Sequence, residues 1–367
     1  MSDITRIGIV GVGQIGKRHL ARYATIPGVA VVAASDTNAA ELKGVADEYA
    51  IDHTYSDFRE MLNRDDIVAV DVCLHNNLHA PVTIAALRAG KHVFCEKPIA
   101  GSYVDGKAMV EAAQECERML SIQLNRLFSK ETKIAKRMID AGRLGEIYHA
   151  RSIGFRRRGR PFVDGYGTAN FVQKASSAGG ALIDMGVYHI SEMLHLLGQP
   201  EIARISGKVY QETGMDAARR EQSRYDVEEL GMGFVRFTNG ATLDILESWA
   251  IHLGGFESSW IVGSDGGLRL NPLSFHATLD DVEVNATVEV NEVDRRWHMM
   301  DPDESGYDSP QHHWIAALQH RVPLLPTAEL ALQTMLISEG IYLSDELGRE
   351  VSVEEVESAS QSKSIAI

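Results

Sequence analysis

The sequence predicts an α/β fold: a doubly wound parallel sheet at the N-terminus, followed by an α+β domain with a large, mostly antiparallel sheet. Over residues 1–124, apolar strand-like runs alternate with helical stretches, as in parallel sheets. Beyond residue 125, strand-like runs follow one another directly, which indicates antiparallel pairing. A chain of 367 residues also exceeds what one hydrophobic core usually supports. We therefore expect two domains, residues 1–124 and 125–367.

The first strand-like run, residues 7–10, leads into Gly-Val-Gly-Gln-Ile-Gly and then into a helix-favouring stretch. In such a unit the first glycine makes the turn, the second lets the backbone approach a pyrophosphate, and the third lets the helix pack closely on the strand. The N–H groups at the start of the helix then face the phosphates. The pattern predicts a dinucleotide-binding turn made of Gly11, Gly13, Gln14, Ile15 and Gly16.

An acidic residue is expected about 20 residues after this turn, where it can bind a ribose 2′-hydroxyl. Asp36 closes a second apolar run, residues 29–35, so its carboxylate lies at a strand end. This carboxylate would repel a 2′-phosphate, and the neighbouring Thr37 and Asn38 carry no compensating charge. We therefore expect NAD(H) in preference to NADP(H), bound in part by Asp36 and Thr37. A plain α/β domain without a ligand is the competing interpretation.

Composition and charge argue against several other classes of protein. The formal charge of −15 disfavours a nucleic acid or an anionic membrane surface as the main partner. No apolar run approaches 18 residues, and the first residues resemble neither a signal nor a transit peptide. The three cysteines, Cys73, Cys95 and Cys116, lack metal-ligand spacing and fit reduced thiols. These features predict a cytoplasmic protein.

The elements of the first domain follow in regular alternation. Helices are expected at residues 38–49, 58–62, 76–88 and 102–118, and strands at residues 67–73, 91–95 and 119–124. Ligands bind at the carboxyl ends of the strands in such sheets. The loops that follow the strands are therefore the expected site.

The second domain opens with a helix at residues 130–141 and a strand at residues 145–153. Further strands are expected at residues 202–211, 230–238, 241–250, 257–263 and 282–290, with Asn239 and Gly240 as a hairpin turn. An irregular acidic stretch at residues 294–308 precedes two helices, 310–320 and 327–347, which can pack back on the first domain. The polar tail after Glu354 is expected to be frayed.

Four segments of the chain resemble the Gfo/Idh/MocA oxidoreductase family. They are the glycine turn, Asn76-x-x-His79, residues 89–98 with Glu-Lys-Pro at their end, and residues 179–186, Gly-Gly-Ala-Leu-Ile-Asp-Met-Gly. The resemblance implies a Rossmann domain followed by an open-faced sheet used to form a homodimer or homotetramer. It also implies reversible oxidation of a secondary hydroxyl of a sugar, glycoside or cyclic polyol. The cofactor side implied by it consists of Leu74, His75, Asn76, His79, Glu96 and Lys97.

The chain departs from the family pattern at two places. Leu74 and His75 stand where the family usually has Thr-Pro, in the loop beside the cofactor. The slot four residues after Asp184, where many members carry histidine, holds Tyr188, and His189 comes one position later. Because residues i and i+4 share one helix face, we assign the slot to Tyr188, as in the branches that resemble glucose-fructose oxidoreductase.

Oxidising an alcohol needs a hydride acceptor and a group that takes the hydroxyl proton. Lys97 follows a strand of the sheet that carries the glycine turn, and burial beside a cationic cofactor is expected to lower its pKa. The family resemblance implies that this lysine is catalytic. Lys97 and Tyr188 are therefore the predicted proton-handling groups, with Asp184 orienting the sugar. The competing interpretations are a surface lysine, a helix-capping aspartate and a tyrosine packed in the core.

Other residues are candidates for substrate binding. Asn125 and Arg126 lie at the domain junction, and His189 is either a substrate contact or a buried structural histidine. Residues 156–160 form a dense basic cluster, in which Arg157 is a candidate for binding a phosphate or carboxylate. A solvated charged loop explains this cluster equally well.

No metal site is predicted, because His312, His313 and the acidic residues of 301–308 lack a recognised ligand spacing. Two other functions stay open. One is a dehydrogenase of a phosphorylated or nucleotide-linked sugar. The other is a non-catalytic dinucleotide-binding sensor, which leaves the Glu96-Lys97-Pro98 and Asp184 motifs without a role.

Overall fold

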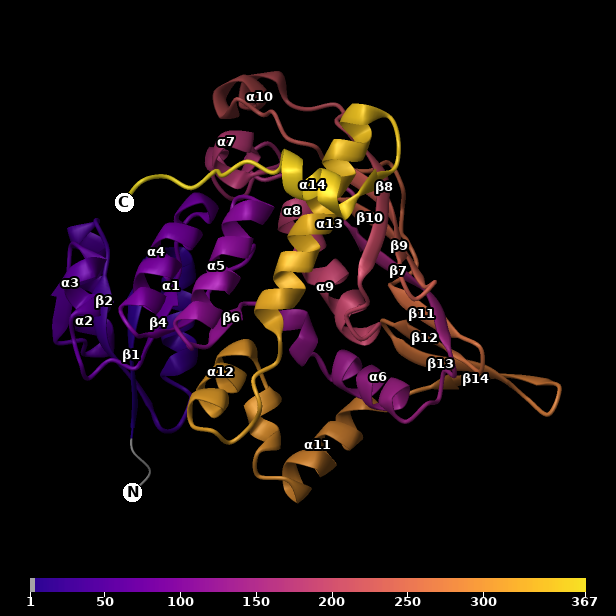
Figure 1. Cartoon of the computed structure of the whole chain (residues 1–367), viewed down its shortest axis with the longest axis horizontal. Helices are drawn as coiled ribbons and strands as arrows, with labels where there is room; N and C mark the ends of the chain where they lie inside the picture. Colours follow the sequence, from indigo (N-terminus) through magenta and orange to yellow (C-terminus); the bar gives the residue numbers. More distant parts are fainter. Residues whose placement is uncertain (1–3) are drawn as a thin grey trace.

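The computed structural model describes residues 4–367, which form two sheets with helices between and around them (Figure 1). The first sheet is parallel, with the strand order β3-β2-β1-β4-β5-β6. Its strands are β1 (Thr5–Val10), β2 (Val29–Ser35), β3 (His53–Tyr55), β4 (Ala69–Val72), β5 (His92–Cys95) and β6 (Leu120–Ile122). The doubly wound sheet predicted from the sequence is confirmed. The strand order reverses between β1 and β4, and ligands bind at such a reversal.

Five helices flank this sheet: α1 (Gln14–Tyr23), α2 (Ala39–Tyr49), α3 (Phe58–Leu62), α4 (Asn76–Arg88) and α5 (Tyr103–Glu115). Polar residues fix several of their first turns, as at α2, where Asn38 accepts from the N–H groups of Ala40 and Glu41. By contrast α1, which follows the glycine turn, has no side-chain cap. Its free N–H groups point out of the helix end.

The second sheet has nine strands in the order β14-β13-β12-β11-β7-β10-β9-β8-β15. They are β7 (Ile147–Phe155), β8 (Ile202–Tyr210), β9 (Leu230–Phe237), β10 (Thr242–Ser248), β11 (Trp260–Gly263), β12 (Gly267–Leu270), β13 (Leu273–Leu279), β14 (Val282–Thr287) and β15 (Val351–Ser352). Only the pair β7 and β10 is parallel. The predicted mostly antiparallel sheet is confirmed, and Gly240, with φ of +89°, turns between β9 and β10.

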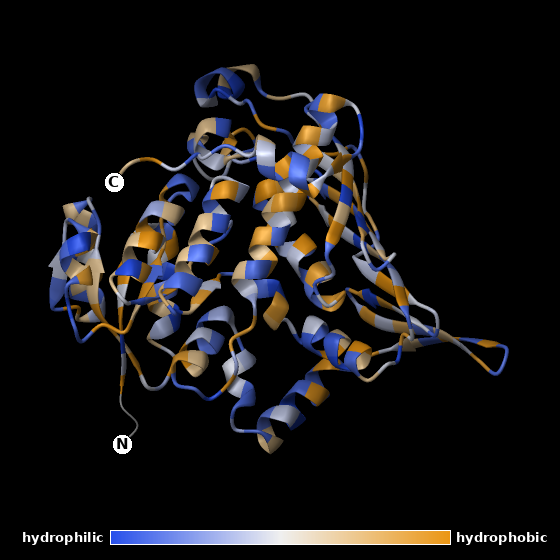
Figure 2. Cartoon of the chain, in the orientation of Figure 1, coloured by the Kyte–Doolittle hydropathy of each residue, from blue (hydrophilic) through white to orange (hydrophobic). Residues whose placement is uncertain are grey.

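The remaining helices are η1 (Asn125–Phe128), α6 (Lys130–Asp140), η2 (Ala169–Val172), α7 (Lys174–Ser177), α8 (Ala181–Asp184), α9 (Gly186–Leu196), α10 (Ala217–Ser223), α11 (Val290–Met300), η3 (Glu304–Tyr307), α12 (Pro310–Leu318), α13 (Thr327–Leu347) and α14 (Val353–Ala359). Figure 1 shows those that touch the second sheet gathered on one side of it. Hydrophobic residues occur along its strands as well as in these helices (Figure 2).

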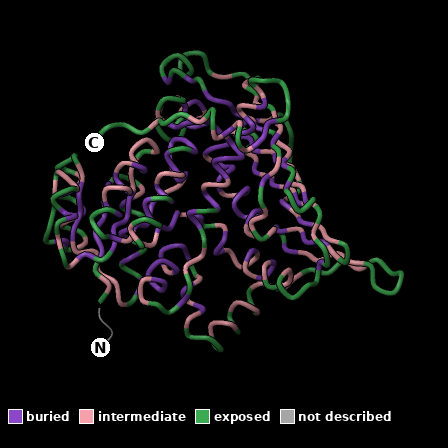
Figure 3. Tube along the Cα trace, in the orientation of Figure 1, coloured by how far each residue is buried: buried purple, intermediate pink, exposed green. Residues whose placement is uncertain are grey.

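Helix α13 lies between the two sheets, in contact with α5 and β6 on one side and with β8 and α9 on the other. Figure 3 shows that the buried parts of the trace gather in this middle region, whereas the β13–β14 hairpin at the edge is exposed. Helix α12 packs on the first sheet, where Trp314 stacks on Phe94 with ring centroids 5.9 Å apart. The domain boundary at residue 124 stays a prediction, since η1 directly follows β6.

Three expectations about single elements are wrong. Residues 290–300, which overlap the stretch expected to be irregular, form α11, whose first turn is capped by Glu289 and whose Trp297 ring centre lies 3.6 Å from the Arg137 guanidinium carbon. The tail does not fray at Glu354, because Ser352 and Glu355 form a capping box that starts α14. The sequence of residues 182–197 is typical of one helix, but the structure breaks this run at Met185 into α8 and α9. Among residues 4–367, no helix is long and apolar enough to cross a membrane.

The buried imidazole of His313 fastens α12 to the loop before α13. Its Nε2 accepts from the N–H of Leu325 at 2.9 Å, and its Nδ1 lies 3.2 Å from the carbonyl oxygen of Gly306. The Leu325 contact requires an unprotonated Nε2, so only the neutral ring fits this position. Burial lowers the pKa of His313 to about 4.

The free energy of unfolding is therefore expected to decrease as the pH falls from about 6.5 to about 4, because His313 becomes protonated. An unfolded histidine has a pKa of about 6.5, so this contribution is complete above that pH and is lost as the pH falls toward 4, by about 3 kcal/mol. Urea unfolding between pH 4 and 7 measures it. His313→Gln should flatten the slope of unfolding free energy against pH. The same change at exposed His53 is the control, and an equal effect of both changes would contradict this account.

Candidate active site

Three side chains from distant parts of the chain meet beyond the carboxyl ends of the first sheet. Lys97 follows β5, Asp184 ends α8, and Tyr188 lies in the first turn of α9. The Lys97 Nζ donates to Asp184 Oδ1 at 2.8 Å and to the Asp184 carbonyl oxygen at 3.3 Å. It also lies 4.7 Å from the centre of the Tyr188 ring. The structure thus brings together all three predicted proton-handling and orienting groups.

The Asp184 carboxylate is held from two sides. One oxygen accepts from Lys97, and the other accepts from the indole N–H of Trp249 at 3.2 Å. Trp249 is fully buried directly after β10, so it is a rigid support. One carboxylate oxygen is therefore bound by a residue that follows the first sheet, and the other by a residue that follows a strand of the second.

The pKa values of the cluster reflect this pairing. Burial lowers the pKa of Lys97, but the charge of Asp184 and the contact with Tyr188 outweigh it, so the net pKa is raised. Burial raises the pKa of Asp184, and Lys97 more than offsets this and lowers it. The expectation of a lowered Lys97 pKa is wrong, because the sequence did not reveal that the ammonium has a carboxylate partner.

A buried carboxylate positions the start of α8. Both oxygens of Glu228 accept from the N–H of Gly180, at 2.9 and 3.0 Å, and one also accepts from Leu182 at 2.9 Å. A Cβ atom at Gly180 would lie 1.9 Å from the Glu228 carbonyl oxygen, so the close approach requires glycine. The Gly179-Gly180 pair thereby allows a turn that aims Asp184 at Lys97.

The glycine turn has the geometry of a dinucleotide site. Gly11 has φ of +90°, and a Cβ atom at Gly16 would lie 2.1 Å from the Gly11 carbonyl oxygen, so both positions need glycine. Gly13 faces open space, with no atom within 4 Å of a Cβ built there. Gln14 and Ile15 begin α1, whose first N–H groups have no side-chain partner. A pyrophosphate fits this arrangement of open backbone and free donors.

Asp36 joins the end of β2 to this turn. Its Oδ2 accepts from the N–H of Val12 at 2.8 Å, and its Oδ1 accepts from the N–H of Asn38 at 2.8 Å. The carboxylate is half-buried and Thr37 is exposed beside it. The residue therefore stands where a ribose beyond the turn would meet it.

The loop between β4 and α4 lies against the glycine turn, since a Cβ atom at Gly11 would lie 2.9 Å from Leu74 Cδ2. Leu74 is half-buried and His75 exposed, and the Asn76 side chain donates to the Ser177 carbonyl oxygen at 3.0 Å. His79 lies behind the loop, within hydrogen-bond distance of the carbonyl oxygens of Leu74 (3.0 Å) and Pro98 (2.8 Å). His79 is fully buried, so it connects this loop to the segment that carries Lys97.

Two segments of the chain, which carry the residues just described, match known protein families. Residues 5–124 match the family described as "Oxidoreductase family, NAD-binding Rossmann fold". Residues 132–269 match the "GFO/IDH/MocA C-terminal domain". The chain belongs to the Gfo/Idh/MocA oxidoreductase family. Its first domain is an NAD-binding Rossmann domain, as the resemblance implied.

Several Gfo/Idh/MocA relatives and structures are similar to this chain. D-Glucoside 3-dehydrogenase of Escherichia coli is 29% identical over 258 residues, 69% of this chain and 72% of that one. Inositol 2-dehydrogenase of Salmonella typhimurium is 40% identical over 144 residues, 38% of this chain and 43% of that one. The apo structure of levoglucosan dehydrogenase superposes with a TM-score of 0.81 at 22% identity, covering 96% of this chain and 99% of that one. That structural likeness concerns the fold.

Within this Gfo/Idh/MocA chain, Glu96 belongs to a buried network that the sequence did not reveal. Its Oε2 accepts from the Lys97 N–H at 2.9 Å, and its Oε1 lies 3.0 Å from His19 Nε2. The other ring nitrogen of His19 lies 2.8 Å from Asp71 Oδ2. Burial lowers the pKa of His19, but Asp71 and its neighbours raise it well above its ordinary value. The sequence spacing could have revealed that His19 is buried, because Gly16, His19 and Tyr23 are spaced to lie on one face of α1, the face that packs on the sheet.

The other predicted substrate residues lie farther from Lys97. His189 is buried, and its Nδ1 lies 2.9 Å from Glu247 Oε2 on β10, whereas Tyr188 faces Lys97. Asn125 is exposed on η1, and Arg126 donates to the buried Glu192 at 3.2 Å. The roles predicted for these residues remain untested by the structure, as does that of exposed Arg157.

Proposed function

We propose that this protein is an NAD(H)-dependent dehydrogenase that reversibly oxidises a secondary hydroxyl of a sugar, glycoside or cyclic polyol. The observation that carries the proposal is the cluster of Lys97, Asp184 and Tyr188 at the carboxyl end of the sheet that carries the dinucleotide turn. Relatives named D-glucoside 3-dehydrogenase, inositol 2-dehydrogenase and levoglucosan dehydrogenase support the substrate class. A structure of the last holds NADH and levoglucosan.

Three features of the turn fit the cofactor. Gly13 faces open space, Gly11 and Gly16 pack too closely for a side chain, and the first N–H groups of α1 have no side-chain cap. When bound, the nicotinamide supplies a hydride acceptor for oxidation and a hydride donor for reduction. The chain must then orient the alcohol and manage its proton. Lys97, next to Glu96 and largely buried, follows β5 at the same end of the sheet as the glycine turn.

In the ion-paired state Lys97 is an ammonium, ready to donate a proton to a carbonyl oxygen during reduction. For oxidation it must become neutral. A substrate hydroxyl that donates to Asp184 competes with the Lys97 contact and weakens the pairing that raises the lysine pKa. Burial, which lowers that pKa, then favours the neutral amine, which can accept the hydroxyl proton. Tyr188, beside the ammonium, provides a second hydroxyl for the transfer.

Replacing Lys97 tests the chemical step. Lys97→Ala should lower kcat by about 100-fold to 10,000-fold, the usual contribution of an acid–base group, while NADH affinity changes only a few-fold. Absorbance of NADH during turnover with sugars, inositols and glycosides measures kcat, and NADH fluorescence measures binding. A variant that keeps its turnover, or a wild-type protein that binds NADH but oxidises no member of the panel, would contradict the proposal.

Two further variants distinguish the candidates for the proton-handling slot. Tyr188→Phe keeps the ring and deletes the hydroxyl, and it should lower kcat by about tenfold or more. His189→Gln should have a much smaller effect on kcat, because its imidazole is turned to Glu247 and away from Lys97. Steady-state kinetics of both variants against the wild type gives the ranking. The reverse ranking would assign the slot to His189.

The preference for NAD(H) follows from Asp36. Its carboxylate can accept from a ribose 2′-hydroxyl but repels a 2′-phosphate, and both of its oxygens already hold the turn in place. We expect NADPH to bind at least ~10-fold more weakly than NADH. Fluorescence titration of the wild type with both cofactors measures the ratio. Equal or tighter NADPH binding would contradict the assignment.

We also propose that the open face of the second sheet joins copies into a homodimer or homotetramer. Tyr210 and Met232 are exposed large side chains on β8 and β9, and the helices gather on one side of the sheet. Apolar sheet surface of this kind marks an interface. Light scattering at micromolar concentration should give a mass of two or four chains. Met232→Lys should weaken the assembly, and a monomeric wild type would contradict the proposal.

A further inference from the structure

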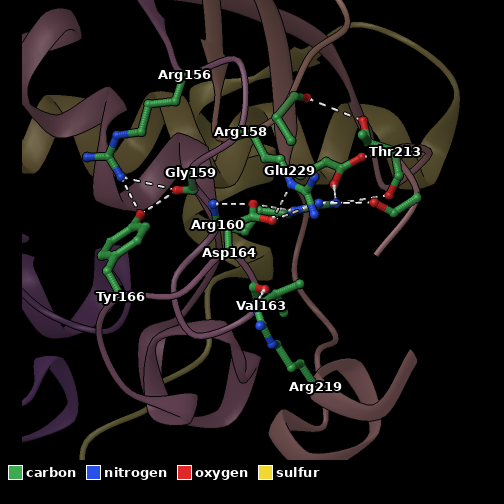
Figure 4. Close-up of polar contacts among 12 residues, drawn as sticks. Arg156, Arg158, Gly159, Arg160, Val163, Asp164, Tyr166, Thr213, Arg219 and Glu229 are labelled. Atoms are coloured by element: carbon green, nitrogen blue, oxygen red, sulfur yellow. Dashed lines mark hydrogen bonds and ion pairs between the residues drawn. The ribbon is translucent and has the colours of Figure 1, made fainter. Parts of the chain in front are cut away.

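The basic loop at residues 156–160 contains arginines that serve different purposes (Figure 4). Arg160 is fully buried and donates to Asp164 at 2.9 Å and Glu229 at 2.8 Å. It also donates to the carbonyl oxygens of Thr213 and Gly214, and Arg158 donates to Asp164 at 3.0 Å. These two arginines therefore hold the loop to the second domain.

Arg156 has a different environment. Its Nη1 donates to the Gly159 carbonyl oxygen at 3.3 Å and to the Tyr166 hydroxyl, and both of these partners are neutral. The Tyr166 hydroxyl in turn donates to the Gly159 carbonyl oxygen. Figure 4 shows Arg156 and Tyr166 on the side of the loop opposite to Glu229 and Thr213. Within residues 4–367, no carboxylate forms an ion pair with Arg156, so its charge is not neutralised locally.

The strand before the loop sets the direction of Arg156. In β7, Gly154 lies against His189 and Glu247, on the face that α9 covers. Side chains alternate along a strand, so Arg156 continues this face and Arg157 continues the opposite one. The parallel pairing with β10 extends to Arg156, whose N–H donates to the Ser248 carbonyl oxygen at 2.7 Å. By the same alternation Arg157 falls on the opposite side, so the inference below concerns Arg156, and the role predicted for Arg157 stays a prediction.

The next residue after Ser248 connects this position to the site. Trp249 donates its indole N–H to Asp184, and its carbonyl oxygen accepts from the N–H of Gly159 at 2.8 Å. The Ser248-Trp249 segment thus contacts both Asp184 and the loop that carries Arg156. Their charges interact: after burial and Lys97, Arg156 is the next group that affects the pKa of Asp184, which it lowers.

We propose that Arg156, steadied by Tyr166, binds a negatively charged group of the substrate, and that the substrate is a sugar or polyol carrying a carboxylate or phosphate. This inference rests on the dehydrogenase function proposed above. Lys97 is already paired with Asp184, whereas Arg156 has no carboxylate partner among residues 4–367 and can meet an anion. Its Nε and Nη2 hydrogens are not used by the contacts described, and a guanidinium edge of this kind matches the two oxygens of a carboxylate or phosphate.

The test compares matched sugars. Wild-type protein with NAD⁺ is assayed on glucose, galactose and mannose, on the corresponding uronic acids, and on the 6-phosphates. We expect kcat/KM to favour one anionic series over the neutral sugars by about 10-fold to 100-fold. The favoured series identifies the anion as a carboxylate or a phosphate.

The same assay on variants assigns the preference to one residue. Arg156→Gln should raise KM for the favoured anionic sugars by about 10-fold to 100-fold and leave KM for neutral sugars nearly unchanged. Arg156→Lys should recover part of the affinity. Arg158→Gln is the matched control, because it removes the same charge from the same loop while Asp164 stays paired with Arg160. It should leave KM unchanged.

Several outcomes would overturn the inference while the proposed function stands. These are equal kcat/KM for neutral and anionic sugars, an equal effect of Arg156→Gln on both, or a loss caused by Arg157→Gln in its place. If no sugar, inositol or glycoside is oxidised, the proposed function fails, and calorimetric titration of the NADH complex with D-glucuronate and D-glucose 6-phosphate decides. Binding that Arg156→Gln abolishes supports the inference, and absence of binding to the wild type overturns it.

Discussion

The ion pair between Lys97 and Asp184 is the interaction on which the site depends. It joins a loop of the first sheet to a helix that packs on the second, so neither half contains the site alone. Because both groups are largely buried, each would be costly without the other. The contacts that surround the pair, from Trp249 to Asp184 and from Glu96 to the Lys97 backbone, hold the two partners in register.

Two buried carboxylates, Glu228 and Asp71, hold the segments that carry Asp184 and Lys97. Glu228 holds the backbone of the Gly179-Gly180 turn, and Asp71 holds His19, which reaches Glu96. In each case the negative charge is satisfied by N–H donors or by a cationic ring, as burial requires. Charges therefore alternate from Asp71 through His19, Glu96 and Lys97 to Asp184. These five charges leave a net charge of −1, so most of the charge is compensated within the buried network.

The sequence was sufficient where the signal is local. The period of apolar residues predicted both sheets, and the spacing from Gly11 to Asp36 predicted the cofactor turn that the family match supports. Tyr188 lies beside Lys97 although the helix breaks between Asp184 and Tyr188, and its assignment to the proton-handling slot stays a prediction. The sequence was insufficient where partners are distant in sequence. Trp249 and Glu228 lie far along the chain from the residues they hold, and the Lys97 pKa was misjudged because its partner comes from another domain.

The position of α13 has a consequence for how the molecule moves. This helix of 21 residues packs against β6 and α5 on one side and against β8 on the other. It therefore belongs to the hydrophobic layers of both sheets. The two sheets cannot swing apart as independent lobes without exposing that helix to water, which costs free energy in proportion to the apolar area uncovered. Cutting the chain before Thr327 would therefore remove structural support from both halves at once.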